Sequence, residues 1–326
     1  MGQPPIPPTP VGTNLTGKTI IVTGGNAGIG YESARQFLEL GASRVILACR
    51  SVSRGQEAVA TLRADPVIKK VNPKAVIEVF ELDLDDYQSG LEFANRVKRE
   101  VEQLDLLLNN GGTAMLSYER SKSGHERMMQ VNCYTHVLVC LALFPLLRST
   151  AAARGAPTRI TWVGSSVHKA QHSLRRRPVA AGGSVLRHFD DAANFHRAAR
   201  YADSKLAVGA CARRLAAVAP AEVLVNSVCP GFVQTTLDRG LPFYVRPVMA
   251  LARRALGRLV GDGARAVVHA SAVAGPETNG MFLQNNEIDL GVTILDEAVG
   301  QAFIDKLWAE TVEDVASLDP TLALYS

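Results

Sequence analysis

Short apolar runs alternate with longer amphipathic stretches along most of the chain. The runs, rich in Val, Ile and Leu, indicate seven strands, and stretches with helical spacing of apolar positions lie between them. Near-continuous apolar strands indicate burial on both faces, and strict alternation with helices indicates parallel pairing. The pattern predicts a single doubly wound α/β domain with a seven-stranded parallel sheet and helices on both faces. The expected strands are Thr19–Thr23, Arg44–Cys49, Ala75–Glu81, Asp105–Asn109, Arg159–Gly164, Val223–Cys229 and Gly280–Gln284; the expected helices are Ile29–Leu40, Arg54–Ala64, Tyr87–Gln103, Gly124–Leu147, Tyr201–Val218 and Gly263–Ala274.

Two segments interrupt this alternation. Residues 167–200 form a basic stretch with glycines and histidines between a strand and a helix, and a connection of about 34 residues inside a compact domain is usually functional. Residues 237–260 indicate an extra helical excursion with apolar residues, including Phe243, Tyr244 and Met249. We expect the first segment to be a long active-site loop and the second to be a substrate lid.

The two ends of the chain differ from the domain between them. Residues 1–16 begin with five prolines between Met1 and Thr13 and contain no apolar run of the kind a secretory signal needs. We expect residues 1–16 to be a flexible arm, residues 17–313 to be the folded domain and residues 314–326 to be a C-terminal tail.

Composition narrows the class of protein. The 326 residues are 47% hydrophobic and 20% charged, which is typical of a soluble globular protein with a large core. A net charge of +4 is too small for a nucleic-acid binder. The basic excess is local: residues 168–200 hold seven Lys/Arg against two Asp, and residues 239–258 hold five Arg and no acid. Either patch is a solvated face or attracts an anionic cofactor or substrate.

Cysteine usage and hydropathy give no indication of a disulfide framework, a metal site or a membrane span. The five cysteines include no CxxC pair and lie mostly in apolar runs, so we expect buried thiols and a cytoplasmic location. His168 and His172 lie four residues apart but have no third ligand at suitable spacing, so no metal is expected. The apolar stretch Val131–Leu147 is shorter than the ~20 residues of a spanning helix and is expected to be a core helix.

A glycine-rich turn follows the first expected strand and opens the first expected helix. It reads Thr23-Gly24-Gly25-Asn26-Ala27-Gly28-Ile29-Gly30. Glycines there allow a tight turn, close approach of a pyrophosphate and close helix packing, and the helix start offers free N–H groups. The context of strand, turn and helix predicts a dinucleotide site at Gly24, Asn26, Gly28, Ile29 and Gly30.

The spacing of this turn departs from GxGxxG and resembles that of the short-chain dehydrogenase/reductase family. Further family motifs follow in register, and the resemblance covers residues 17–313 and implies a Rossmann fold. The segments around Arg44–Arg50, Ser165–His168 and Tyr201–Leu206 look most like the retinol-dehydrogenase branch and its soluble fungal relatives. The motifs in register are Asp83-Leu84, Asn109-Asn110-Gly111-Gly112, Asn132, Ser165-Ser166, Tyr201-Ala202-Asp203-Ser204-Lys205 and Pro230-Gly231-Phe232-Val233-Gln234-Thr235.

The second strand indicates which cofactor is preferred. It ends Cys49-Arg50-Ser51, with a cation and no carboxylate, which favours the 2′-phosphate of NADPH over NADH. The resemblance implies that Asp83 contacts the adenine, Asn109 lines the adenosine and ribose side, and Val233 and Thr235 contact the nicotinamide end. The other candidate cofactor residues are Leu84, Asn110, Gly111, Tyr201, Lys205, Pro230 and Gly231.

Tyr201 and Lys205 have the i,i+4 spacing that places two side chains on one helix face. A tyrosine is a poor acid–base at neutral pH, and we expect the nearby ammonium to lower its pKa. By resemblance, Ser166 hydrogen-bonds the substrate oxygen, with Ser165 as the alternative. Asn132 would hold a water linking Lys205 to solvent, or would be a cap or buried hydrogen-bonding residue.

These residues predict an NADPH-dependent reductase, or the reverse alcohol dehydrogenase, acting by Tyr acid–base catalysis on a ketone, aldehyde or alcohol. The apolar lid predicts a largely hydrophobic substrate. One alternative is a non-catalytic NADPH sensor of the same fold. Another is an enzyme whose arginine-rich segment 237–260 rests on a lipid surface. Similar proteins form homodimers through the helices expected at Gly124–Leu147 and Tyr201–Val218; a monomer is the alternative.

Overall fold

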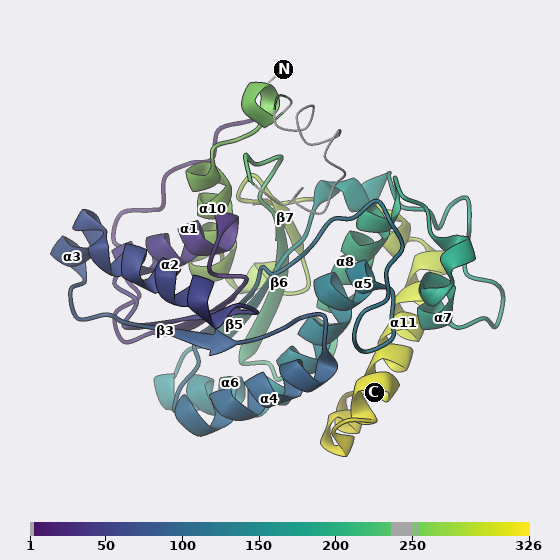
Figure 1. The fold of residues 1–326 in the computed structure, drawn as a ribbon, viewed down its shortest axis with the longest axis horizontal. Coiled ribbons are helices and arrows are strands. Elements are labelled where there is room, and N and C mark those ends of the chain that lie inside the picture. The colour runs from purple at the N-terminus through teal and green to yellow at the C-terminus, as the bar shows by residue number, and fades with distance from the viewer. Residues whose placement is uncertain (1–2, 236–250, 252) are drawn as a thin grey trace.

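A computed structural model describes residues 3–235, 251 and 253–326 of the chain (Figure 1). Its centre is one eight-stranded sheet in the order β3-β2-β1-β4-β5-β6-β7-β8. The sheet is parallel from β3 to β7, and β8 pairs with β7 in the antiparallel sense. The strands are β1 (Thr19–Thr23), β2 (Arg44–Cys49), β3 (Val76–Glu81), β4 (Leu106–Asn109), β5 (Thr158–Val163), β6 (Val223–Cys229), β7 (Phe282–Gln284) and β8 (Glu287–Ile288).

The doubly wound α/β prediction is confirmed, but the expected number of strands was wrong by one. β8 consists of two residues that return beside β7 after a tight turn at Asn285 and Asn286, both of which have positive φ. So short a hairpin carries no run of alternating apolar residues, which is why the sequence pattern does not show it.

The helices divide between the two faces of the sheet, and alternate residues of β1 show the division. Ile21 packs in the apolar cluster with α4, α6, α8 and α11, whereas Ile20 and Val22 pack in the cluster with α1, α2, α3 and α10. Burial on both faces therefore accounts for the continuous apolar strands. The helices are α1 (Gly28–Glu39), α2 (Val52–Ala64), α3 (Pro66–Val71), α4 (Tyr87–Glu100), α5 (Arg127–Met129), α6 (Thr135–Arg154), α7 (Val185–Asp190), α8 (Arg200–Val218), α10 (Val260–Val268) and α11 (Ala298–Ala316).

The helical stretch Arg127–Arg154 is long and apolar enough to cross a membrane, yet 67% of its most apolar window is buried inside the protein. This confirms the prediction of a core helix. The stretch is not one regular helix, because a π-helical turn at Gln130–Tyr134 separates α5 from α6. Such turns insert one extra residue and are frequent at functional sites.

The C-terminal helix α11 packs along α8 and contacts α6 (Figure 1). The expected tail from residue 314 continues this packing: Leu322 is buried, and the Trp308 indole donates to the carbonyl of Tyr325 at 2.8 Å. The faces of α6 and α8 that we expected to be available for a homodimer are therefore partly covered by the chain's own C-terminal segment.

The N-terminal segment, expected to be a flexible arm, lies against the domain from residue 3 onward. Gln3 is hydrogen-bonded to the backbone of Phe232 and Leu256, and Ile6 is buried. Arginine side chains also hold its backbone, since Arg258 donates to the carbonyl of Pro4 and Arg265 to that of Ile6.

Of the two segments that interrupt the alternation of strands and helices, the structure describes residues 167–200 fully and residues 237–260 only in part. Residues 167–200 contain the 3-10 turn Ser166–Lys169, the helix α7 and the 3-10 turn Ala192–Asn194, so the expected loop is largely ordered. Of the expected lid at 237–260, residues 237–250 and 252 lie outside the described part of the chain. At its described end Leu256 and Leu259 are exposed.

Candidate active site

The glycine-rich turn lies between β1 and α1 and leaves a bare backbone surface. Gly24 and Gly28 have φ values of +63° and +56°, which side-chain-bearing residues rarely adopt. A Cβ on Gly30 would lie 2.5 Å from the carbonyl oxygen of Gly24, so no side chain fits there. The N-cap residue Ala27 offers no side-chain cap to the first N–H groups of α1. Asn26 and Ile29 are half-buried in the same turn. The turn therefore fits a pyrophosphate.

Thr23 braces this turn against the loop after β4. Its hydroxyl oxygen accepts from the backbone N–H groups of Asn110 and Gly111, each at 2.9 Å, and lies 3.0 Å from Nε2 of His136. Burial lowers the pKa of His136 to about 3, so the imidazole is neutral and can accept the Thr23 proton. Neither residue is among the predicted site residues: Thr23 opens the glycine-rich motif but has no predicted role, and His136 belongs to none of the motifs.

The two asparagines after β4 support the site rather than project into it. The Asn110 amide donates to the carbonyl of Thr23 at 2.8 Å and so holds the glycine-rich turn. The Asn109 amide donates to Sγ of Cys140 at 3.0 Å, and the residue is buried. The Asn109 side chain thus lies toward α6, and the expectation that Asn109 lines the adenosine and ribose side remains a prediction. A Cβ on Gly111 would lie 2.4 Å from Cδ1 of Leu84, so a larger residue there would require the Leu84 side chain to move.

The candidate adenine end lies beyond β2 and β3. Arg50 is exposed directly after β2, and Ser51 caps α2 by accepting from the N–H of Arg54. Asp83 is mostly buried after β3 and is paired with Lys122, with a 2.8 Å contact between Oδ2 and Nζ. Contact between Asp83 and an adenine therefore remains a prediction.

The candidate nicotinamide end is the segment after β6. Gly231 has a φ of +87°, and Arg258 donates to the carbonyl of Pro230 at 2.9 Å. Val233 is buried and forms an isolated bridge with Arg258. The methyl group of Thr235 lies 3.8 Å from the position a Cβ on Gly28 would take, which brings this segment over the glycine-rich turn.

Tyr201 and Lys205 lie on the first turns of α8, with the Lys205 ammonium 5.8 Å from the centre of the Tyr201 ring. Lys205 donates to the carbonyl of Val163 at the end of β5, at 2.8 Å, and burial lowers its pKa to about 8. Burial, reinforced by Cys229, raises the pKa of Tyr201. In the chain by itself the pKa of Tyr201 is therefore raised, because desolvation of the phenolate dominates, and the expected lowering by Lys205 stays a prediction.

The two serines at the end of β5 have different surroundings. The side chain of Ser165 lies near enough to Tyr201 to offset part of the rise in the tyrosine pKa. The Ser166 hydroxyl instead lies 3.7 Å from Sγ of Cys229. Successive residues of an extended chain point to opposite sides, and Ser165 is the last extended residue before the 3-10 turn at Ser166. These surroundings favour Ser165 as the serine nearer Tyr201, and which of the two serines contacts the substrate oxygen stays a prediction.

Asn132 lies in the π-helical turn next to this group, and its side chain is fully engaged. Its amide donates to the Ser204 hydroxyl at 2.8 Å and to the carbonyl of Thr113 at 3.0 Å, and its Oδ1 accepts from the N–H of Thr113 at 2.7 Å. The observed role of the Asn132 side chain is to join α8 to the loop after β4. A role in holding a water remains a prediction.

Among the described residues, no group of three or more His, Cys, Asp or Glu side chains is arranged to hold a metal ion. His168 is held instead by the carbonyl of Ser165, 2.6 Å from its Nδ1, and its ring packs on Phe282. All five cysteines are buried free thiols, as expected.

The geometry above is that of a known class of enzymes. Residues 18–173 match the family model of the short chain dehydrogenases. The chain is 62% identical, over 289 residues, to the short chain dehydrogenase sor7 of Hypocrea jecorina (strain QM6a), an alignment covering 89% of this chain and 81% of sor7. The chain therefore belongs to the short-chain dehydrogenase/reductase family, whose members are oxidoreductases.

Two further relatives extend the comparison. The short chain dehydrogenase macD of Penicillium terrestre is 38% identical over 317 residues, which cover 97% of this chain and 96% of macD. A solved structure, the RhlG/NADP active-site complex of Pseudomonas aeruginosa, superposes with a TM-score of 0.61 at 25% identity, covering 83% of this chain and 96% of that one. The comparisons support membership of the family and not the retinol-dehydrogenase branch in particular.

Proposed function

We propose that the chain is an NADPH-dependent reductase that interconverts a ketone or aldehyde and the corresponding alcohol on a largely hydrophobic substrate. The observation that carries this proposal is the meeting of Ser165, Tyr201 and Lys205 at the carboxyl end of β5, beside a glycine-rich turn suited to a dinucleotide. Ligands of open α/β sheets bind at this edge.

Each of the three side chains would have a separate role in the reaction at the substrate oxygen. NADPH, when bound, supplies the hydride. Ser165 would donate a hydrogen bond to the carbonyl oxygen and so polarise it. Tyr201 would deliver the proton, and its raised pKa keeps the phenol protonated at neutral pH, which suits reduction. The Lys205 ammonium would stabilise the negative charge left on Tyr201.

The preference for NADPH rests on the end of β2. Arg50 is exposed there and is followed by Ser51 at the start of α2, so a 2′-phosphate would meet a cation and a helix N-terminus. The solved RhlG complex contains NADP, which supports the same choice. A cytoplasmic location accords with the five buried free thiols and stays a prediction.

The preference for a hydrophobic substrate rests on side chains beyond β6. Phe232 is 38% exposed, and Leu256 and Leu259 are more than 60% exposed. These side chains would present apolar surface to a bound substrate.

The test is NADPH consumption by the purified chain against a panel of apolar ketones and aldehydes, with Tyr201→Phe measured beside it. We expect turnover that the Tyr201→Phe variant lacks while it still binds NADPH. Tight NADPH binding with no turnover by the intact chain on any substrate would favour a sensor of the same fold. Equal turnover by both proteins would remove Tyr201 from the mechanism.

A further inference from the structure

Arg200, the residue before Tyr201, is fully buried. Its guanidinium donates to the carbonyl of Phe189 at 2.8 Å and to that of Asn194 at 3.1 Å. It also lies 5.2 Å from the ring centre of Phe189 and 5.1 Å from that of Phe195. One side chain at the start of α8 therefore holds the end of the 167–200 segment.

Two buried carboxylates face this guanidinium. Glu126 and Asp203 each lie 3.5 Å from a nitrogen of Arg200, and all three side chains are at most 1% exposed. Burial raises the pKa of both carboxyl groups, while the charge of Arg200 acts in the opposite direction. We call Arg200, Glu126 and Asp203 the charged hub.

Each carboxylate also holds a second segment of the candidate site. Asp203 accepts from the N–H of Ser173 at 2.6 Å and from its hydroxyl at 2.9 Å, and Ser173 lies in the segment that leaves Ser165. Glu126 caps α5 by accepting from the N–H of Met129 at 3.0 Å, directly before the π-helical turn of Asn132. The hub thus joins the segments of Ser165, Tyr201 and Asn132.

Stability alone is a poor reason for such a cluster. Removing charges from water costs several kcal/mol per ion, and well-packed apolar residues often replace buried ion pairs without loss. Here the partners stand at 3.5 Å, and Oε1 of Glu126 has no hydrogen-bond partner among the described residues. The contribution of the hub is therefore geometric. Each charged side chain favours one position of a segment that carries a candidate catalytic group.

We propose that Arg200, with Glu126 and Asp203, is a positioning residue that sets the Tyr201 hydroxyl against Ser165. Arg200 does this without touching substrate or cofactor. The proposal rests on the proposed function, because it assigns the hub to that same site. It also explains how a 35-residue separation between Ser166 and Tyr201 is compatible with a defined geometry at the site.

The test compares three variants with the intact chain. Arg200→Met removes the charge at similar length, and Arg200→Lys keeps the charge but loses the fork that reaches two carbonyls. Arg213→Met is the matched control, since Arg213 lies on the same helix and makes an ion pair with Asp296 at 2.7 Å, far along α8 from Tyr201. Folding of each variant is checked by thermal unfolding.

We expect Arg200→Met to lower kcat on the order of 100-fold, the effect of a displacement of about 1 Å, with KM and NADPH affinity changed by less than about threefold. Arg200→Lys should lie between it and the intact chain, and Arg213→Met should retain full kcat. If Arg200→Met lowers kcat no more than Arg213→Met does, the proposal is overturned. If Arg200→Met does not fold, unchanged kcat in Arg200→Lys overturns it.

Crystal structures of the same variants give a readout that does not need turnover. We expect the Ser165–Tyr201 contact to be lost or lengthened in Arg200→Met and retained in Arg213→Met. An intact contact in Arg200→Met and Arg200→Lys overturns the positioning role even if no substrate is found. The intact chain could show no turnover while the Ser165–Tyr201 contact changes as expected in Arg200→Met. That result would count against the proposed function and would leave the positioning role of the hub supported.

Discussion

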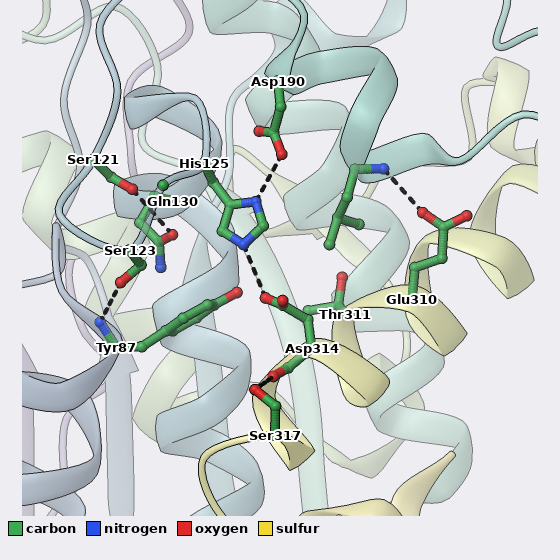
Figure 2. Close-up of polar contacts among 12 residues, drawn as sticks. Tyr87, Ser121, Ser123, His125, Gln130, Asp190, Glu310, Thr311, Asp314 and Ser317 are labelled. Atoms are coloured by element: carbon green, nitrogen blue, oxygen red, sulfur yellow. Dashed lines mark hydrogen bonds and ion pairs between the residues drawn. The ribbon is translucent and has the colours of Figure 1, made fainter.

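The cofactor side and the substrate side of the site are built differently. The cofactor side, from β1 to β4, consists of short connections whose backbone comes close together at Gly24, Gly30 and Gly111. The substrate side depends on the 167–200 segment and on α11, which charged side chains join to α8 and to the residues before α5. There, the charged hub includes Arg200, the residue before Tyr201, and His125 bridges Asp190 and Asp314 (Figure 2).

The cofactor side is specified mainly by residues close together in the chain, and the substrate side mainly by contacts between residues far apart in it. A glycine-rich turn depends first on the backbone conformation of a few consecutive residues, although Asn110 and Gly111 also hold it from the loop after β4. The substrate side brings together residues up to 189 positions apart, as in the contact between His125 and Asp314. Charges that attract only one partner in one geometry make such a long segment take a single position.

The largest effect that we expect distinguishes two adjacent serines. Ser165→Ala should lower kcat by about 100- to 1,000-fold, because a hydrogen-bond donor to the developing oxyanion is lost. Ser166→Ala, the control, should change kcat little, since its hydroxyl faces Cys229. Steady-state rates on the best substrate of the panel measure both, and the opposite ranking would restore Ser166 to the site.

On the cofactor side, Gly30→Ala should weaken NADPH binding by about 10- to 100-fold, the effect of 1–3 kcal/mol of overpacking. The added methyl would lie 2.4 Å from the Asn110 amide and 2.5 Å from the Gly24 carbonyl oxygen. Gly209→Ala is the control, because its Cβ on α8 meets only Leu295, at 3.4 Å. Titration of NADPH fluorescence measures both, and equal affinities would show that the turn tolerates a side chain.

On the substrate side, His125→Gln should lower the free energy of unfolding by about 2 kcal/mol at pH 7, as charge-assisted hydrogen bonds are lost. Burial would lower the pKa of His125, but Asp190 and Asp314 outweigh it and raise the value to about 9 from 6.5. Because the folded pKa is the higher one, the stabilisation is complete below pH 6.5 and disappears as the pH rises through 9.

Denaturant unfolding at pH 6, 7.5 and 9.5 tests the His125 bridge. The difference between the intact chain and His125→Gln should shrink as the pH increases. The exposed His196 provides the control variant His196→Gln, which should unfold like the intact chain at every pH. A difference that is independent of pH would mean that His125 stabilises the protein by packing alone.

Arg50→Ala should weaken NADPH binding by about tenfold and leave NADH binding nearly unchanged, because one charge-assisted contact to the 2′-phosphate is lost. Arg99→Ala on the exposed side of α4 is the control for general electrostatic attraction. Dissociation constants for both cofactors give the answer. Equal losses for NADPH and NADH would remove Arg50 from the 2′-phosphate site.

The smallest effect concerns pH. The pKa of Lys205 is lowered to about 8 by burial, so its ammonium is charged below pH 8 and neutral above it. Carbonyl reduction leaves negative charge on Tyr201, and we expect kcat for reduction to fall severalfold as the pH rises through about 8. A kcat profile that stays flat to pH 9.5 would show that the charge of Lys205 does not assist the reaction.

The features that the sequence predicts correctly are mostly those formed by residues close together in the chain. Three of the expected strands, Thr19–Thr23, Arg44–Cys49 and Val223–Cys229, coincide with the observed ones, because buried strands are continuous apolar runs. The glycine-rich turn and the pair of Tyr201 and Lys205 follow from spacing within one element. α3, α7 and β8 are missing from the expectation because they are short, whereas α11 has a regular helical spacing of apolar residues from Phe303 to Val315 that could have predicted it.

Tertiary structure decided which side chains the site contains. The different surroundings of Ser165 and Ser166 at the end of β5, and the hydrogen bond from Asn109 to Cys140 on α6, become visible only in the fold. The sequence by itself determined the alternation of elements, the glycine-rich turn and the tyrosine–lysine pair, since each depends on residues close together in the chain. The charged hub and the His125 bridge depend on attraction between distant residues, and only the folded chain brings those residues together.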